Sequence, residues 1–165
     1  MRAIDSIPKK ITDLKTACFK VAAWRATGKT IAITNGCFDI LHEGHIFSLS
    51  QAAKEADILI VGVNSDASIK RLKGNDRPIN HEQSRALILA SLAVVDAVVI
   101  FEEDTPLHLI QEILPDFLVK GGDYTVEQIV GSKEVIANGG KVVINPIVEG
   151  YSTTGIIQQI KSSYS

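Results

Sequence analysis

Two histidines, His42 and His45, stand three positions apart with Gly44 between them, where a predicted strand passes into a predicted helix. A helix N-terminus carries unpaired backbone N–H groups and a partial positive charge, so it is already a site for anions. Side chains three positions apart share one helix face, and a glycine lets a ligand approach the backbone closely. This pattern predicts a polyphosphate bound under two imidazole rings.

The histidines have two alternative interpretations. A single histidine at such a place is more often a hydrogen-bonded helix cap, but the spacing and the preceding Asn-Gly-Cys-Phe-Asp turn favour a phosphate site. A zinc site is disfavoured because Cys18 and Cys37 lie outside ligand spacing and the His-x-x-His pair lacks the glutamate of the zinc proteases. We therefore name no protein ligand for a metal ion.

A second set of polar groups precedes the last predicted helix. Gly150 and Tyr151 are followed there by Ser152, Thr153 and Thr154, which offer hydroxyl oxygens and free backbone amides. An ordinary Ser/Thr helix cap is the alternative. The position after the final predicted strand favours binding of the β- and γ-phosphates of a nucleotide.

A glycine-containing segment follows another predicted strand and reads Lys120, Gly121, Gly122, Asp123, Tyr124. Paired glycines let the backbone come close to a base or a ribose. A simple turn would show the same residues. We assign the segment to the nucleotide pocket.

The most polar stretch of the chain, residues 73–78, is predicted to be a mobile loop over the site. It begins with Lys73 and contains Arg77, and Lys70 and Arg71 come just before it. These cations are either a solvated helix face, as most charge runs are, or a group that closes over phosphates. For Lys73 we predict closure over phosphates.

Apolar runs alternate with helical patterns along the chain, and this alternation predicts the scaffold. Strands are expected at 31–34, 58–63, 97–101, 117–120 and 141–144, and helices at 45–56, 67–72, 81–92, 106–113, 132–138 and 154–160. The order predicts an α/β, Rossmann-like, doubly wound fold with a mainly parallel five-stranded sheet and helices on both faces. Asn80 and Thr105 are expected to start two of the helices. Ligands of such sheets bind beyond the carboxyl ends of the strands.

The first residues form an added element in this interpretation. Ile11, Leu14, Cys18 and Val21 recur at helical spacing, and Gly28 follows as a stop. Residues 1–28 are therefore predicted as a flanking N-terminal helix that packs on the domain. Residues 29–165 are predicted as the domain that carries the site.

Composition restricts the class of protein. The chain has 165 residues with 45% hydrophobic content, and its 17 Lys and Arg against 19 Asp and Glu give no basic footprint of a nucleic-acid-binding protein. Two cysteines without paired spacing indicate reduced thiols and a cytoplasmic location. No apolar run approaches the ~18 residues of a membrane span. We expect neither a nucleic acid nor a membrane as a partner.

The run from Asn35 to His45, N-G-C-F-D-I-L-H-E-G-H, resembles the signature of the cytidylyltransferase-like nucleotidylyltransferases. Further segments, V-G-V-N-S-D, R-L-K-G, R-P-I, E-D-T-P, L-V-K-G-G-D-Y and G-Y-S-T-T, are similar to one branch of that family, the heptose 1-phosphate adenylyltransferases of bacterial surface-sugar biosynthesis. The resemblance covers residues 29–160. The glycerol-phosphate cytidylyltransferase branch carries an arginine just before its G-x-S-T-T motif, whereas residues 146–149 read P-I-V-E, which disfavours CTP.

The resemblance implies transfer of the adenylyl group of ATP to D-glycero-β-D-manno-heptose 1-phosphate with release of pyrophosphate. His42, His45 and Lys73 would be catalytic, and Mg²⁺ would be held mainly by the phosphates. The implied nucleotide-binding residues are Asn35, Gly36, Phe38, Asp39, Gly44, Asn64, Arg85, Lys120, Gly121, Gly122, Asp123, Tyr124, Ser152, Thr153 and Thr154. For Arg85 a solvated helix position is the alternative.

Partners and rival functions follow from the same resemblance. Related enzymes often carry a fused sugar kinase, and the residues before 29 are too few to hold one, so we expect the kinase to be a separate chain. A homodimer is a further expected assembly. The rivals are a glycerol-phosphate, ethanolamine-phosphate or flavin mononucleotide nucleotidylyltransferase, and a nucleotide-binding module without turnover.

Overall fold

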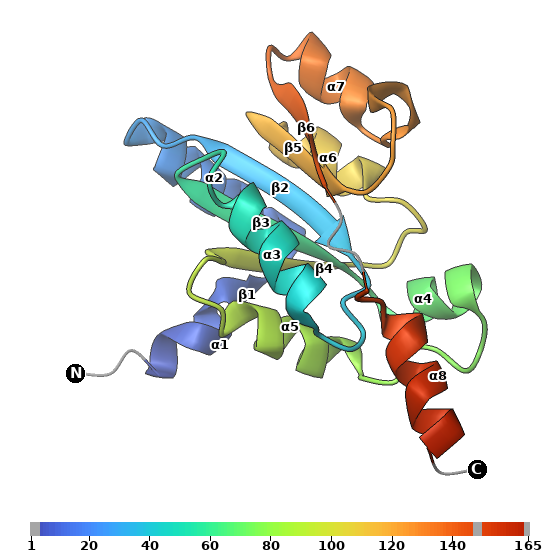
Figure 1. Ribbon diagram of the computed structural model, residues 1–165. Coiled ribbons are helices and arrows are strands. Elements are labelled where there is room, and N and C mark those ends of the chain that lie inside the picture. Colours follow the sequence, from blue (N-terminus) through green and yellow to red (C-terminus); the bar gives the residue numbers. More distant parts are fainter. Residues whose placement is uncertain (1–3, 147–149, 164–165) are drawn as a thin grey trace.

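The computed structural model describes residues 4–146 and 150–163 (Figure 1). Its strands are β1 (Ile11–Thr12), β2 (Ile31–Gly36), β3 (Ile58–Asn64), β4 (Ala97–Phe101), β5 (Phe117–Gly121) and β6 (Lys141–Asn145). Its helices are α1 (Ile7–Lys10), α2 (Leu14–Ala26), α3 (Glu43–Ala52), α4 (Asp66–Lys73), α5 (Glu82–Ala90), α6 (Leu107–Ile113), α7 (Ser132–Ala137) and α8 (Thr153–Ser163), with 3₁₀ turns η1 (Ile4–Ser6) and η2 (Val126–Gln128).

The strands form one sheet in the order β1-β4-β3-β2-β5-β6, and every neighbouring pair is parallel. The chain moves outward from β2 through β3 and β4 and then returns to place β5 on the other side of β2. The crevice between β2 and β5 is therefore the switch point of a doubly wound sheet, where ligands bind. The predicted Rossmann-like parallel sheet is confirmed. The prediction of five strands was wrong, because the structure has an additional strand, β1. This strand has two residues, too few to show a periodic pattern in the sequence.

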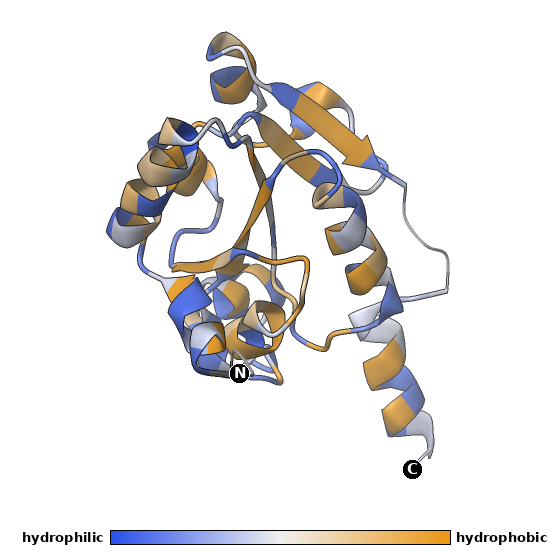
Figure 2. Cartoon of the chain, turned by 90° about the vertical axis from the view of Figure 1, so that its left-hand side faces the viewer, coloured by the Kyte–Doolittle hydropathy of each residue, from blue (hydrophilic) through white to orange (hydrophobic). Residues whose placement is uncertain are grey.

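Alternate residues of each strand face two separate hydrophobic cores. On β2, Ile31 and Ile33 pack with residues of α2, α6 and α7, whereas Ala32 packs with residues of α3 and α5. Figure 2 shows the strands as predominantly hydrophobic ribbons. A sheet covered on both faces appears in sequence as continuous apolar runs, which is why the five longer strands were predicted close to their observed bounds.

The N-terminal segment joins both the sheet and a core. β1 pairs with β4 at the sheet edge, and Ala17 and Val21 of α2 are buried. Ile11, predicted on a helix face, lies in β1 instead. Helix α2 begins after Asp13, whose carboxylate accepts the N–H of Thr16 at 2.7 Å and so satisfies one of the free amides of the first turn.

Helix α2 ends at Ala26, just before Gly28, the residue that was predicted to stop it. Gly28 has a φ of 78°, its N–H donates to the carbonyl of Arg25, and the N–H of Lys29 donates to the carbonyl of Trp24. This pair of bonds is the Schellman motif, which a residue with positive φ completes. The proposed division between residues 28 and 29 stays a prediction.

Two helix starts differ from the prediction. The N-cap of α5 is His81 and the N-cap of α6 is Pro106, in place of Asn80 and Thr105. The side-chain amide of Asn80 instead donates to the carbonyl of Asp39 at 2.6 Å. A tertiary partner thus takes the residue that local sequence assigned to a helix cap.

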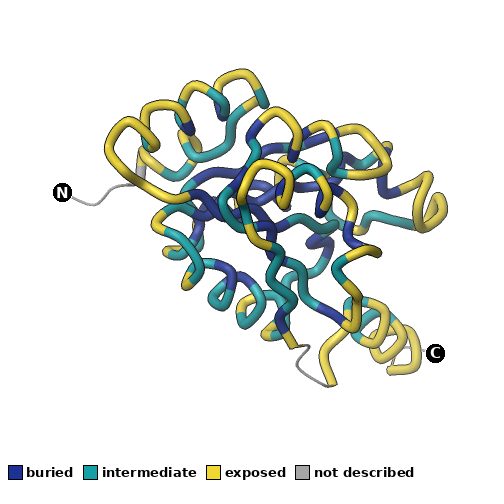
Figure 3. The backbone as a smooth tube through the Cα atoms, turned by 90° about the horizontal axis from the view of Figure 1, so that it is seen from above, coloured by how far each residue is buried: buried dark blue, intermediate teal, exposed yellow. Residues whose placement is uncertain are grey.

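Helix α8 projects from the body and is the most exposed helix beside the site (Figure 3). None of its residues, Thr153–Ser163, is buried in the part of the chain that the structure describes. Residues 147–149, which belong to the segment that lacks the cytidylyl-branch arginine, lie outside the described residues. Within the described ranges, no helix has the length and apolar content needed to cross a membrane.

Candidate active site

The two histidines lie side by side where β2 leads into α3. His42 is the N-cap of α3, and its carbonyl accepts the N–H of His45 at 2.9 Å and the N–H of Ile46 at 3.2 Å. The imidazole centroids are 3.8 Å apart with an angle of 23° between the planes. The spacing places both rings at the helix N-terminus, where they stack on each other.

Both imidazoles are neutral at pH 7. Burial lowers the pKa of His42, and burial followed by the charges of His42 and Lys73 lowers the pKa of His45 to about 4. In residues 4–146 and 150–163, the buried Nδ1 atoms of both rings have no hydrogen-bond partner. A neutral imidazole has one donor and one acceptor nitrogen. Each ring thus keeps unused hydrogen-bonding capacity, which a phosphate oxygen would satisfy as an acceptor.

Gly44 is required by the closeness of its neighbours. A Cβ atom at this position would lie 3.2 Å from Nδ1 of His42 and 3.2 Å from Cβ of Tyr151. Both distances are shorter than ordinary van der Waals contact. The glycine therefore lets the first turn of α3, the His42 ring and the start of α8 come together.

The strand end before the histidines has an unusual backbone. Phe38 has a φ of 45°, and its ring centroid lies 5.2 Å from that of His45. The same ring would be 3.1 Å from a Cβ atom at Gly36. A positive φ is uncommon for a residue other than glycine and is found at sites where the surrounding structure holds it.

Two adjoining cavities meet at His45, Lys73 and Thr153. The first, of about 480 Å³, is lined by Asn35, Gly36, Cys37, Phe38, Asp39, His45, Asn64, Leu72, Lys73, Arg77, Asp104, Thr105, Pro106, Lys120, Tyr124, Val130 and Thr153. The second, of about 340 Å³, is lined by His42, Gly44, His45, Ser48, Lys73, Gly121, Pro146, Tyr151, Ser152, Thr153 and Thr154. The structure thus brings nearly all predicted site residues together at the carboxyl ends of the strands.

The start of α8 lies opposite the start of α3. Ser152 accepts the N–H of Gly155 at 2.9 Å, so this serine is also a helix cap. The hydroxyl of Thr153 donates to the carbonyl of Ile40 at 3.5 Å, and the hydroxyl of Tyr151 donates to Glu43 at 2.5 Å. Two helix N-termini therefore border one cavity.

Lys120 crosses the switch point between β5 and β2. Its ammonium donates to the carbonyl of Asn35 at 3.4 Å and to the side-chain oxygen of Asn35 at 3.3 Å. Burial lowers the pKa of Lys120. Both of these hydrogen-bond partners are neutral oxygens, so the ammonium can also pair with an anion in the first cavity.

The segment after Lys120 is only partly in the site. Gly121 borders the second cavity and Tyr124 the first. Gly122 has a φ of 134° and a Cβ there would lie 2.6 Å from the ring of Tyr124, so it shapes the turn that places the tyrosine. Within the part of the chain that the structure describes, Gly122 and Asp123 line neither cavity.

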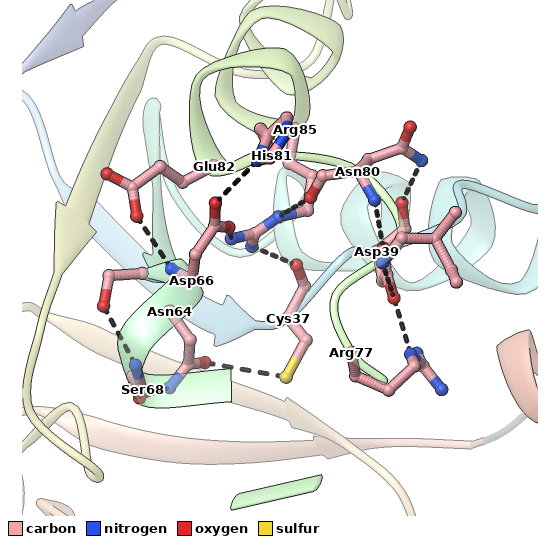
Figure 4. A network of polar contacts seen from close by, with 12 residues as sticks. Cys37, Asp39, Asn64, Asp66, Ser68, Arg77, Asn80, His81, Glu82 and Arg85 are labelled. Carbon is pink, nitrogen blue, oxygen red and sulfur yellow. Dashed lines mark hydrogen bonds and ion pairs between the residues drawn. The ribbon is translucent and has the colours of Figure 1, made fainter. Parts of the chain in front are cut away.

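Asp39 is buried and holds the loop that follows α4. Its carboxylate accepts Arg77 Nε at 2.6 Å, the N–H of Ile79 at 2.8 Å and the N–H of Asn80 at 2.9 Å (Figure 4). Burial raises the pKa of Asp39, but the amides of Asn80 and Ile79 and the Arg77 guanidinium outweigh it and lower the pKa overall. The carboxylate is therefore committed to the loop.

Arg85 lies behind the histidine turn. Its side chain is fully buried and donates to the carbonyls of Asn80 at 2.9 Å and Cys37 at 2.6 Å and to the carboxylate of Asp66 at 2.8 Å. Figure 4 shows the guanidinium between Asp66 and Cys37. This differs both from the predicted ligand contact and from the solvated alternative, because Arg85 supports the turn from its buried side.

Sequence reasoning missed several residues of the first cavity. Five residues that were not named as site residues line it: Leu72, Asp104, Thr105, Pro106 and Val130. Asp104 to Pro106 belong to the E-D-T-P segment after β4. The rule that ligands collect beyond the carboxyl ends of parallel strands was the signal that could have found them.

A larger hollow lies elsewhere and carries different chemistry. It measures about 660 Å³ between α2 and α6 and is mostly apolar, with Leu14, Cys18 and Phe19 among its residues. Size alone would favour this hollow. The convergence of two helix N-termini, two neutral imidazoles and lysines favours the smaller cavities as the site.

Comparison with known proteins agrees with this geometry. The family model described as Cytidylyltransferase-like matches residues 33–159. The chain is 53% identical over 152 residues to the bifunctional protein HldE of Mesorhizobium japonicum, and 54% identical over 153 residues to that of Caulobacter vibrioides. These alignments cover 92% and 93% of this chain but 31% and 32% of the relatives. The chain thus spans about a third of the length of the curated relatives that it matches.

Solved structures show the same architecture. A lipopolysaccharide core biosynthesis protein from Thermoplasma volcanium is 31% identical, with a TM-score of 0.61 over 76% of this chain and 100% of that one. Pantoate-beta-alanine ligase from Francisella tularensis is 18% identical, with a TM-score of 0.56 over 92% of this chain and 76% of that one, and shares the fold. The stacked histidines at a helix N-terminus, the doubly wound sheet and the matched family model together show that the chain belongs to the cytidylyltransferase-like family of nucleotidyltransferases.

Proposed function

We propose that this protein transfers the adenylyl group of ATP to D-glycero-β-D-manno-heptose 1-phosphate, giving ADP-heptose and pyrophosphate. One observation carries the reaction type. His42 and His45 stack at the N-terminus of α3, beside Lys73 and opposite the N-terminus of α8. Such a site gathers hydrogen-bond donors and positive potential around a polyphosphate, and direct transfer between phosphates requires no enzyme nucleophile.

The transfer needs positioning and charge stabilisation. An oxygen of the sugar phosphate attacks the α-phosphorus of ATP, and the bond from that phosphorus to the bridging oxygen of pyrophosphate breaks. A phosphate monoester is largely a dianion at neutral pH, because its second pKa is ~6, so no strong general base is required. His42 and His45 would donate N–H groups to the oxygens of the α-phosphate, and Lys73 would stabilise the charge on the leaving phosphates.

The two cavities suit the two substrates. The second cavity has two helix N-termini and the hydroxyls of Ser152, Thr153 and Thr154, which suit a triphosphate. The first cavity holds Asn35 and Asn64, which the resemblance assigns to the nucleotide, and also Asp104 and Thr105, whose polar groups suit a sugar with several hydroxyls. His45 and Lys73 border both cavities, so the reacting phosphates would meet there.

Magnesium would enter with the nucleotide. In the part of the chain that the structure describes, no group of three His, Cys, Asp or Glu could hold an ion. The carboxylate of Asp39 is engaged by Arg77 and by backbone amides. Phosphate oxygens and water would therefore hold Mg²⁺, as is usual for this cation, and the ion would neutralise phosphate charge.

The choice of sugar and nucleotide rests on similarity. The V-G-V-N-S-D, E-D-T-P and K-G-G-D-Y segments together resemble the heptose branch, and residues 146–149 lack the arginine of the cytidylyl branch. The Thermoplasma volcanium neighbour is described as a lipopolysaccharide core biosynthesis protein. A homodimer and a cytoplasmic location complete the proposal.

The test is pyrophosphate release with heptose 1-phosphate, glycerol 3-phosphate and flavin mononucleotide, each paired with ATP and with CTP. A mispaired base leaves buried polar groups unsatisfied at about 1 to 3 kcal/mol each, so ATP should be preferred to CTP roughly ten- to hundredfold. Glycerol 3-phosphate lacks most ring hydroxyls and should be rejected. A faster pair than heptose 1-phosphate with ATP would contradict the named activity. Nucleotide binding without release in any pair would instead indicate a non-catalytic module.

A further inference from the structure

We infer that Asn80 is a positioning residue, which locks the loop after α4 to the turn before His42 so that Lys73 and the two histidines keep one mutual geometry. The effect on rate rests on the proposed function. The mechanical coupling between loop and turn does not.

Two hydrogen bonds join Asn80 to Asp39 of the site turn, and a third joins it to Arg85 of α5. Its N–H donates to the carboxylate of Asp39 at 2.9 Å, and its side-chain amide donates to the carbonyl of Asp39 at 2.6 Å. Its own carbonyl accepts Nε of Arg85 at 2.9 Å. The backbone and side chain of this one loop residue thus bind both the turn and helix α5 (Figure 4).

The partners of Asn80 are buried and tied to the same turn. Asp39 is 2% exposed, and its carboxylate also accepts Arg77 and the N–H of Ile79 from the loop. Arg85 is 1% exposed and donates to the carbonyl of Cys37 at 2.6 Å. Breaking one member of a buried polar network leaves other groups unsatisfied, so displacement at Asn80 should spread to residues 37–39.

Lys73 begins the loop that Asn80 ends. Lys73 closes α4 and borders both cavities together with His45. His45 and Lys73 are two of the three residues shared by both linings, so the two side chains face the same space. A loop fixed at its far end by Asn80 therefore sets where Lys73 stands relative to the histidines.

Asn80 itself lines neither cavity in the described part of the chain. A direct substrate contact is thus a poor account of any rate effect. The alternative role for Asn80 is a purely local one, at the start of α5, since Asn80 precedes the N-cap His81. Aspartate serves that local role as well as asparagine does, so the two accounts differ in what Asn80→Asp should do.

The first test needs no substrate. Amide hydrogen exchange is measured on the wild type, Asn80→Ala, Asn80→Asp and the control Asn138→Ala, an exposed asparagine at the end of α7. Both Asn80 variants should exchange faster in residues 74–81 and also in 37–45, with Asn80→Asp the faster because its carboxylate faces the Asp39 carbonyl and carboxylate. Faster exchange confined to 74–81, or an Asn80→Asp variant as protected as the wild type, would overturn the inference.

The second test uses the pyrophosphate assay with the pair that the wild type turns over. Asn80→Ala should lower kcat about tenfold, on the scale of one lost hydrogen bond, while KM for both substrates changes less than about threefold. Asn80→Asp should be slower still, and Asn138→Ala should match the wild type. A rise in KM without a fall in kcat would overturn the positioning role. Wild-type inactivity with every pair would reject the proposed function, and the exchange result would still decide the coupling.

Discussion

The two helix N-termini that border the site are attached to the protein very differently. Helix α3 carries buried Leu49 and Ala52 and packs on the sheet, and the turn before it is held by Asp39 and Arg85. Helix α8 has no buried residue among Thr153–Ser163 as described, and it is linked to α3 by the bond from Tyr151 to Glu43. One side of the site is built into the core, and the other lies on the surface.

The difference suggests a division of work. Groups aimed at developing charge are most effective when they are fixed before the reaction. The histidine side meets this condition because its supports are buried. The α8 side offers hydroxyls and amides on an exposed helix, which suits binding of phosphates far from the reacting atom. We therefore expect substitutions on the α3 side to lower kcat and substitutions on the α8 side to act mainly on nucleotide binding.

The largest effect is expected at the histidines. His42→Ala and His45→Ala should each lower turnover by on the order of 10²-fold or more, the scale seen when a preorganised charge stabiliser is removed. Steady-state kinetics and thermal melting measure rate and folding separately. Turnover close to that of the wild type with an unchanged melting temperature would reject the assignment and remove the distinction between the two helices.

A matched pair of glycines tests the comparison directly. Gly44→Ala places a methyl group 3.2 Å from Nδ1 of His42, in the fixed turn, and should lower kcat about tenfold by displacing the ring. Gly155→Ala on α8 places a methyl group 3.0 Å from the side-chain Oγ of Ser152 and gains helix propensity of ~1 kcal/mol. Its kcat should stay within about twofold of the wild type. Equal losses of kcat in both variants would show that the two helix starts are equally constrained.

A smaller effect, on stability, is expected from acid. The unfolded chain binds a proton on His45 below pH 6.5, whereas the folded protein binds it only near pH 4. The free energy of unfolding should therefore fall as the pH drops from 6.5 to 4, by about 1 to 2 kcal/mol at pH 5. Urea unfolding at pH 7 and pH 5 measures this. His45→Gln should lose less stability over the same interval, and an identical loss would mean that His45 is not the group responsible.

Much of the fold could be predicted because both faces of the sheet are buried. Strands such as β3 then appear as unbroken apolar runs, and the intervening helices show their own period. The glycine after α2 was equally informative because its positive φ is a local requirement. Strand β1 could not be predicted because two residues show no periodic pattern. Its place at the sheet edge depends on pairing with β4.

The placement of side chains could be predicted where a motif is continuous in sequence and could not be predicted where the partners are distant. His42, Gly44 and His45 act within one helix start, so their spacing fixes their geometry. Asn80 and Arg85 each have a plausible local role near α5, yet their partners lie on the turn after β2. Local sequence cannot show which of two possible partners a polar side chain takes, because the choice depends on what the fold places beside it.

The sequence alone therefore determined the chemistry that the chain can offer, through residue types at a strand-to-helix turn and a second hydroxyl-rich helix start. Tertiary structure decided which groups are free to meet a ligand and which are used as supports. Burial makes both imidazoles neutral. Hydrogen bonds engage Asp39 with the loop and Arg85 with the buried side of the turn. The physical reason is that solvation and hydrogen-bond partners, which set pKa and availability, come from residues far apart in the chain.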